Sequence, residues 1–288
     1  GGVHIFSEKC MQNIRNVTKI FSVPLVCDEI QSGFGRAGFF LASEIYHIYG
    51  DYIILGKSLG GGLAKISALA IDSSFFCEDF SLIHSSTFAE DDFSSYIALE
   101  ALSLFDREPL FDTAKEKGEY FYSLILNVQK KYPDILKEIR GTGLFWAVEF
   151  YGGDRSSSNT IRTFSGQNAL SYIITGYLLH EHNIRVAPTL SCQNTLRIEP
   201  SVYIEQSDIE ILVRAIERVC EILDKANAGE LCKYLVHLET PKTQKEITSF
   251  KINYLPYEIP RFSKKAAFIC HFIQAKDIRL YEPSFHFF

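Results

Sequence analysis

The sequence predicts an α/β protein, and three observations indicate this fold class. An apolar run at 23–28 (VPLVCD) ends in an acid, as buried strands of parallel sheets often do. A second apolar run at 52–55 leads directly into a glycine-rich stretch at 56–62. At 208–225, apolar residues recur with the i, i+3, i+4, i+7 spacing of an amphipathic helix. Strands that alternate with loops and helices are typical of α/β domains.

The first part of the chain contains most of the predicted strands. The elements expected there, in order, are a strand at 23–28, a glycine loop at 33–38, a short helix at 41–49, strands at 52–55 and 66–71, and a helix over 92–130. Pro109 is expected to interrupt that helix, because proline lacks the backbone N–H that a helix interior needs.

The second part mixes helices and strands. The elements expected there are a strand at 144–150, a polar serine-rich loop at 154–165, a helix at 167–182, a strand at 195–199 and the helix at 208–225. Ser207 and Glu210 have the spacing of a capping box at the start of that last helix. Its apolar stripe predicts burial of Ile209, Leu212, Val213, Ile216, Val219, Cys220 and Leu223.

These patterns divide the chain into four regions. Residues 1–110 are predicted to form an α/β domain and 111–226 an α+β domain. Residues 227–263 contain three prolines in mixed sequence and are interpreted as a linker. Residues 264–288 are aromatic and apolar, and are predicted to begin a further domain.

Composition and charge exclude several classes of protein. With 47% hydrophobic residues, 22% charged residues and a net charge of −6, the 288-residue chain is globular, with no general attraction to nucleic acid or anionic membranes. No apolar stretch reaches the ~18 residues of a membrane span. The seven cysteines are scattered without a C-x-x-C pair, which predicts a reducing, cytoplasmic setting and no zinc site.

Two residues next to predicted strands could carry chemistry. Asp28 ends a strand, at the edge of the sheet where α/β proteins bind ligands; a solvated loop acid is the alternative. Lys57 follows the next strand, in the tripeptide Gly-Lys-Ser. A phosphate-binding P-loop is disfavoured, because five residues separate Gly50 from Gly56 where that motif needs four.

Together, the stretches around these residues resemble the class III aminotransferases, pyridoxal-phosphate enzymes of fold type I. The stretches are LVCDEIQSGFGRAGFFLASE and, further on, GDYIILGKSLGGGLAKISALAI, which match the family's DE-x-Q-x-G-x-x-R-x-G run and K-x-x-x-G-G lysine motif. Asp28 precedes Lys57 by 29 residues, a typical family spacing. The segments HSSTF, IRGTGLFWAVEF and TLRIEPSVYI resemble later family motifs, so the resemblance extends over residues 1–226.

The resemblance implies a partial cofactor-binding large domain at 1–110, a small domain at 111–226, and a homodimer. It implies that Lys57 forms the Schiff base and moves the α-proton, while Asp28 keeps the pyridine nitrogen protonated. Gln31 would lie near the ring hydroxyl. Thr87 from the neighbouring subunit, helped by Ser86, would bind the phosphate, and Arg197 a substrate carboxylate.

The implied activity is transamination between an amino acid or amine donor and an aldehyde or keto acid, with a secondary-metabolite pathway as its expected setting. Racemisation or decarboxylation on the same cofactor, and a non-catalytic remnant acting as an interaction domain, stay open as alternatives. Ala89, Glu90, Asp91 and Asp92 replace the family's G-G-N-P run, which puts the usual substrate class in doubt. Family members also carry a phosphate-binding turn before residue 1, so this chain alone is expected to bind the cofactor poorly and to be inactive.

The last segment carries a second resemblance. KAAFICHFIQAKDIRLYEPSF, at 265–285, resembles the opening of reductases that use a nicotinamide and act on acyl thioesters or acyl-carrier proteins. A fused reductase would supply an aldehyde for amination. An unrelated extension that packs on the aminotransferase is the alternative.

Overall fold

The computed structural model describes residues 2–83, 91–236 and 286–287. Its elements, in order, are α1 (Glu8–Ile20), β1 (Val26–Asp28), η1 (Ala42–Tyr46), β2 (Tyr52–Leu55), η2 (Lys57–Gly60), β3 (Ala68–Ile71), α2 (Glu78–Ile83), α3 (Asp92–Arg107), α4 (Leu110–Lys131), β4 (Leu136–Thr142), β5 (Phe145–Phe150), η3 (Gly153–Arg155), α5 (Asn159–Gly166), α6 (Leu170–His182), β6 (Ile184–Arg185), β7 (Ala187–Pro188), β8 (Thr195–Ile198), α7 (Gln206–Asp224), α8 (Ala228–Leu231), α9 (Lys233–Val236) and β9 (His286–Phe287).

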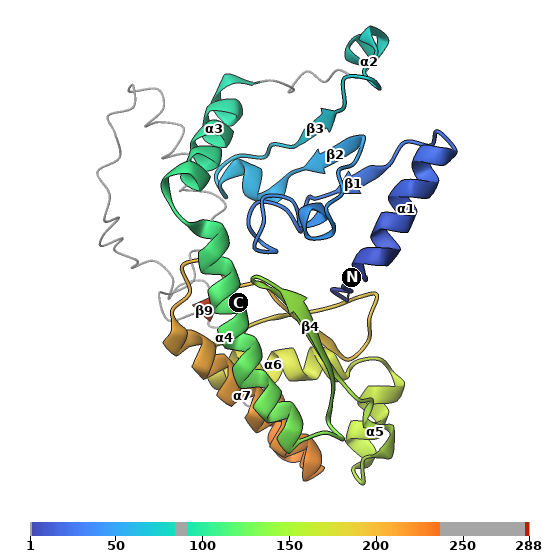
Figure 1. Ribbon diagram of the computed structural model, residues 1–288. Coiled ribbons are helices and arrows are strands. Elements are labelled where there is room, and N and C mark those ends of the chain that lie inside the picture. Colours follow the sequence, from blue (N-terminus) through green and yellow to red (C-terminus); the bar gives the residue numbers. More distant parts are fainter. Residues whose placement is uncertain (1, 84–90, 237–285, 288) are drawn as a thin grey trace, which may run out of the picture.

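The first part forms the upper body in Figure 1, a three-stranded sheet in the order β1-β2-β3 with α1 and α3 beside it. β1 and β2 are parallel, whereas β2 and β3 are antiparallel. A small apolar cluster of Phe34, Leu59 and Ala98 joins the loop after β1 to η2 and α3. The predicted helix at 41–49 is a 3₁₀ helix.

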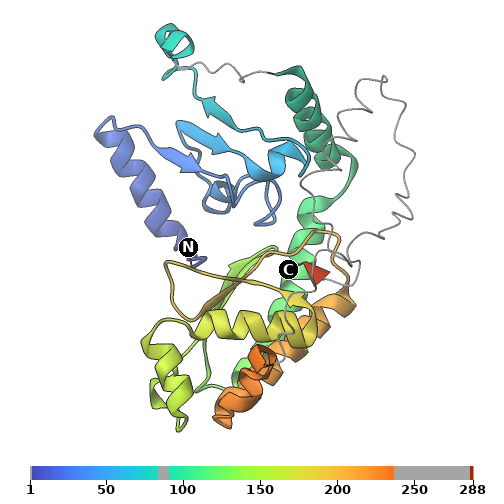
Figure 2. The same ribbon diagram turned by 180° about the vertical axis from the view of Figure 1, so that it is seen from behind.

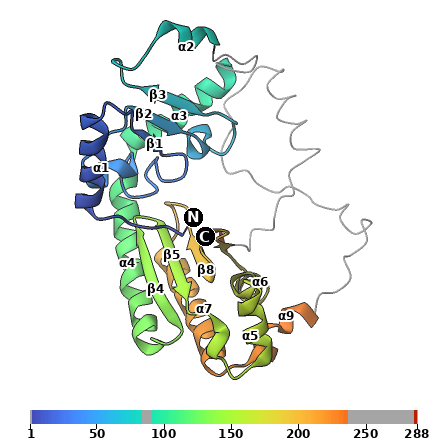
Figure 3. The ribbon, with the colours of Figure 1, turned by 90° about the vertical axis from the view of Figure 1, so that its right-hand side faces the viewer.

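The second part is built on the antiparallel sheet β4-β5-β8-β7, and it contains the main hydrophobic core. α4 and α7 pack against each other along this sheet (Figure 3). α6 lies on the opposite side of the sheet: it is behind the sheet in Figure 1 and in front of it in Figure 2. All seven apolar residues predicted for the stripe of α7 are buried. Two residues of β9 pair with β6 in parallel.

Several elements differ from the predictions. Residues 154–165 were predicted as a loop, which is wrong, because α5 begins at Asn159. The side chain of Ser158 caps its N-terminus and Ile161 is buried, whereas the polar composition of the segment had indicated a loop. The capping box of α7 is made by Glu205 and Asp208, not by Ser207 and Glu210, because the helix begins at Gln206. α1 and β4 were not predicted.

The break between α3 and α4 lies at Glu108–Pro109, as the proline predicted. Among the described helices, none is both long and apolar enough to cross a bilayer. The segment that resembles a reductase, at 265–285, lies outside the described residues. Of the linker predicted for 227–263, the described part forms α8 and α9, and Leu231 and Tyr234 lie in the main hydrophobic core because they pack beside α6.

Candidate active site

Asp28 and Lys57 lie at one edge of the upper sheet. Asp28 ends β1 and is in register with Ile54 of the parallel strand β2. Lys57 follows three residues after Ile54, as the first residue of η2. Because parallel strands end at the same edge, both residues lie at the carboxyl edge of the sheet, where α/β proteins bind ligands. Both side chains are exposed there.

The backbone around the two residues is locally specialised. Asp28 accepts a hydrogen bond from the backbone N–H of Ile30 (3.1 Å), which turns the chain immediately after the strand. Lys57 has a φ of +48°, in the left-handed region that residues other than glycine adopt at a cost of about 1 kcal/mol. Such conformations cluster at functional sites, where the surrounding fold maintains them.

Glu29, next to Asp28, has a structural role. It is buried, and its carboxylate accepts hydrogen bonds from the hydroxyl of Ser32 (2.5 Å) and from the backbone N–H groups of Ala42 (3.1 Å) and Ser43 (2.8 Å). These bonds join the start of the glycine loop to the first residues of η1. Gln31, two residues further on, is thereby presented toward the lower body.

Gln31 and Arg197 meet at a shared carboxylate. The Nε2 of Gln31 donates to Oε1 of Glu199 (2.6 Å), 168 residues away in the chain. The Nε of Arg197 donates to Oε2 of the same carboxylate (3.0 Å). Two residues predicted for opposite ends of the site are therefore joined by Glu199, a residue that sequence reasoning missed. The available signal was the i, i+2 spacing of Arg197 and Glu199, which puts both on one face of a strand.

Arg36 holds the two bodies together. Its Nη1 donates to the carbonyls of Leu144 (3.1 Å) and Pro200 (2.5 Å), and its own carbonyl accepts from the N–H of Leu144 (2.9 Å). Burial lowers the pKa of Arg36, while the negative charge of Glu199 acts in the opposite direction. These contacts place the end of β8 beside the loop that carries Gln31.

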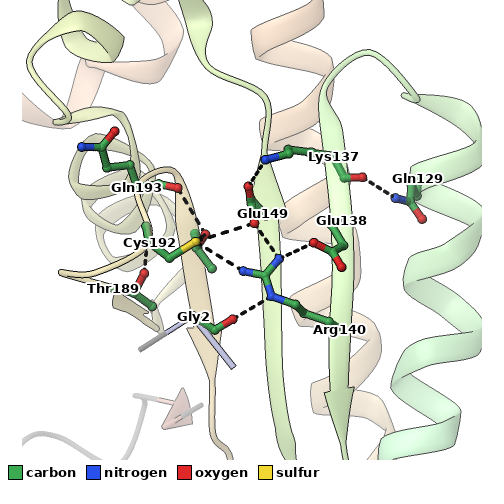
Figure 4. Close-up of polar contacts among 10 residues, drawn as sticks. Gly2, Gln129, Lys137, Glu138, Arg140, Glu149, Thr189, Cys192 and Gln193 are labelled. Carbon is green, nitrogen blue, oxygen red and sulfur yellow. Dashed lines mark hydrogen bonds and ion pairs between the residues drawn. The ribbon is translucent and has the colours of Figure 1, made fainter. Parts of the chain in front are cut away.

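A second polar cluster secures the start of the described chain (Figure 4). The Nε of Arg140 donates to the carbonyl of Gly2 (2.7 Å), and its Nη1 donates to Glu138 (2.8 Å) and Glu149 (2.5 Å). Its Nη2 contacts the sulfur of Cys192 (3.4 Å). This cluster ties the segment before α1 to the sheet of the lower body, so its role is structural.

The remaining predicted site residues, Ser86 and Thr87, lie outside the described residues. Within the described ranges, no group of three or more histidine, cysteine or acidic side chains could hold a metal ion. An exposed amine and an exposed carboxylate at one sheet edge fit pyridoxal phosphate, which needs a lysine for attachment and an acid for its ring nitrogen.

Parallel strands that present an acid and a lysine at one edge, beside an α+β domain that contributes an arginine, have the arrangement of a pyridoxal-phosphate fold of type I. A family model described as aminotransferase class-III matches residues 1–220. The chain therefore belongs to the class III aminotransferase family.

Individual relatives agree with this assignment. The mitochondrial ornithine aminotransferase of Arabidopsis thaliana is 29% identical over 234 residues, which are 80% of this chain and 46% of the relative. The ornithine aminotransferase of Brevibacillus brevis is 29% identical, over 77% of this chain and 50% of the relative. The chain thus spans about half the length of the curated relatives it matches.

Solved structures give the same result for the fold. The ornithine aminotransferase of Toxoplasma gondii superposes with a TM-score of 0.65 at 27% identity, over 78% of this chain and 50% of that one. A second structure of that enzyme, with a TM-score of 0.64 at 26% identity, covers 78% of this chain and 49% of its own, and has partial occupancy of pyridoxal phosphate at its active site.

Proposed function

We propose that the protein catalyses pyridoxal-phosphate-dependent transamination, moving an amino group between an amino acid or amine donor and an aldehyde or keto acid. The observation that carries this proposal is the placement of Asp28 and Lys57 at the same edge of the parallel pair β1–β2. Membership of the class III aminotransferase family supports it. A secondary-metabolite pathway rests on the sequence of 265–285 alone.

The chain's own residues supply distinct functions. Pyridoxal phosphate, when bound, supplies an electron sink for the α-carbon of the donor. Lys57 offers an amine that attaches the cofactor and takes a proton from the donor's α-carbon. Asp28 offers a carboxylate that favours a protonated ring nitrogen. Arg197 offers a guanidinium for a substrate carboxylate.

Borohydride reduction tests the role of Lys57. The chain is incubated with pyridoxal phosphate and reduced, and the labelled lysine is identified by peptide mass spectrometry. Reduction captures even weakly bound cofactor, so the test does not need tight binding by the isolated chain. We expect label on Lys57, loss of that label in Lys57→Ala, and no loss in the matched variant Lys65→Ala. Label spread equally over exposed lysines would contradict the proposal.

A half-reaction separates transamination from other chemistry on the same cofactor. The whole protein, loaded with cofactor and given donor without acceptor, is expected to release one keto product per site. A racemase would release none, and a decarboxylase would release carbon dioxide. Donor recovered unchanged, with no keto product, no carbon dioxide and no opposite enantiomer, would favour a non-catalytic remnant.

The assembly and setting of the protein are part of this proposal. A homodimer is supported by large apolar side chains exposed on this chain, among them Ile20, Phe21, Leu63 and Ile83. Sedimentation or light scattering tests this oligomeric state.

A cytoplasmic setting is supported by the free thiols of Cys10, Cys27, Cys77, Cys192, Cys220 and Cys232. A fused reductase rests on the sequence of 265–285 alone.

A further inference from the structure

Glu199 connects the two ends of the candidate site. Its Oε1 accepts from the amide of Gln31 (2.6 Å), and its Oε2 accepts from the Nε of Arg197 (3.0 Å). Both side chains of the ion pair are mostly covered, with 24% of Arg197 and 21% of Glu199 exposed. A charge-assisted bond at this depth is screened less than one at the surface, so it can hold the guanidinium in one orientation.

The strand explains why the two charged residues lie together. Leu196 and Ile198 of β8 are buried in the core of the lower body, so the alternate positions 197 and 199 face the other side of the sheet. Arg36 donates a hydrogen bond to the carbonyl of Pro200, which holds this end of β8 beside the loop that carries Gln31. Glu199 directly follows the last residue of β8, so the end of the strand and the contact of Arg36 with Pro200 fix its position.

The contact with Arg197 uses only one edge of the guanidinium. Glu199 accepts from Nε, and among the described residues no hydrogen-bond partner is found for Nη1 or Nη2 of Arg197. Nη1 and Nη2 together form a second edge of the guanidinium, which can bind a carboxylate with two parallel hydrogen bonds.

The local charge also favours an incoming anion. Arg36 and Arg197 contribute two positive charges and Glu199 one negative charge, and Glu199 interacts electrostatically with both arginines. The group of three therefore has a net charge of +1. A net positive charge of this kind favours a substrate carboxylate over a neutral group.

We propose that Glu199 is a positioning residue, which orients Arg197 for binding of a substrate carboxylate and holds the Gln31 amide at the cofactor end of the site. This inference rests on the proposed function, since it specifies which substrates benefit: donors or acceptors that carry a carboxylate.

Chemical modification tests the proposal without catalysis. Phenylglyoxal reacts with guanidinium groups, and glutarate serves as the carboxylate probe; the modification of Arg197 is followed by peptide mass spectrometry on the full chain. In the unaltered chain glutarate is expected to protect Arg197. In Glu199→Ala, the glutarate concentration that gives half-protection is expected to rise about tenfold, because a hydrogen bond to a charged group is lost.

Two further variants serve as controls for the protection experiment. Glu199→Gln keeps an oxygen that can accept from Arg197, and is expected to recover part of the protection. Glu210→Ala removes an exposed partner of Arg214 and is expected to leave protection of Arg197 unchanged. Tighter glutarate protection in Glu199→Ala would show that Glu199 blocks Arg197, and no protection in the unaltered chain would also overturn the proposal.

Kinetics of the whole, cofactor-loaded protein provide a second readout. Glu199→Ala is expected to raise KM for a carboxylate-bearing donor about tenfold more than KM for the corresponding simple amine. An equal rise for both donors would indicate a merely structural role. If no transamination occurs, the proposed function fails, while the protection experiment still decides the role of Glu199.

Discussion

Gly118 of α4 lies directly against Gly143, the turn residue between β4 and β5. A Cβ atom added to Gly118 would lie 1.9 Å from the carbonyl oxygen of Gly143. Gly143 in turn has a φ of +55° and packs against the backbone of Ala37 and Gly38 in the loop after β1. This column of backbone contacts sets the spacing between the two bodies that share the candidate site.

Replacing Gly118 with alanine is therefore expected to destabilise the chain by about 3 kcal/mol, because backbone atoms must move to admit the methyl group. Urea denaturation measures the change. Gly166→Ala is the matched control in an exposed helical position with no atom within 4 Å of the added Cβ, and it should be neutral or stabilising by up to about 1 kcal/mol. Equal effects of the two substitutions would contradict this account.

Glu149 should make stability depend on pH. Burial opposes its ionisation, but hydrogen bonds from Lys137 (2.5 Å) and Arg140 (2.5 Å) outweigh burial and hold the pKa of Glu149 below its ordinary value. A carboxyl group with a lowered pKa stabilises the fold above its unfolded-state pKa, and this contribution is lost as the pH falls through the folded-state value.

Glu149→Gln is accordingly expected to cost about 3 kcal/mol near neutral pH, since it leaves Arg140 without its buried partner. The difference from the unaltered chain should shrink when urea denaturation is repeated at increasingly acid pH. A difference that stays constant down to pH 3 would rule out this carboxylate as the titrating group.

Asp51 is expected to control the attachment of α1. No residue of α1 is buried, so its docking depends on polar contacts, chiefly two hydrogen bonds of 2.7 Å from Arg15 to the Asp51 carboxylate. Asp51→Asn should raise hydrogen exchange across Glu8–Ile20 several-fold, through loss of the ion pair. Glu100→Gln, which removes an exposed ion pair with Arg107, is the control and should not affect α1.

Asp28 is expected to act on catalysis more than on attachment of the cofactor. In a cofactor-loaded, active protein, Asp28→Asn should lower kcat at least about 100-fold, because a preorganised charge at the developing carbanion system is lost. Borohydride labelling of Lys57 should persist in this variant. Asp72→Asn, which alters an exposed acid just after β3, should retain activity; equal losses in both variants would argue against a specific role for Asp28.

Much of the fold was predictable from local pattern. The boundaries of β2, the break at Pro109 and the buried stripe of α7 follow from short runs of sequence, because strand and helix periodicity is a property of neighbouring residues. α5 was missed because its polar composition hides a two-turn amphipathic pattern, and α1 because it buries no side chain against the core.

The candidate site, too, was predictable from the sequence only in part. The motif around Asp28 and the lysine motif at Lys57 identified the family from sequence, since each is a contiguous run and their spacing is characteristic. What only the tertiary structure decided is which distant residues meet: Gln31 with Glu199, Arg36 with Pro200, and Gly118 with Gly143. These contacts depend on how two bodies pack, and packing is set by the whole core and by no local run of residues.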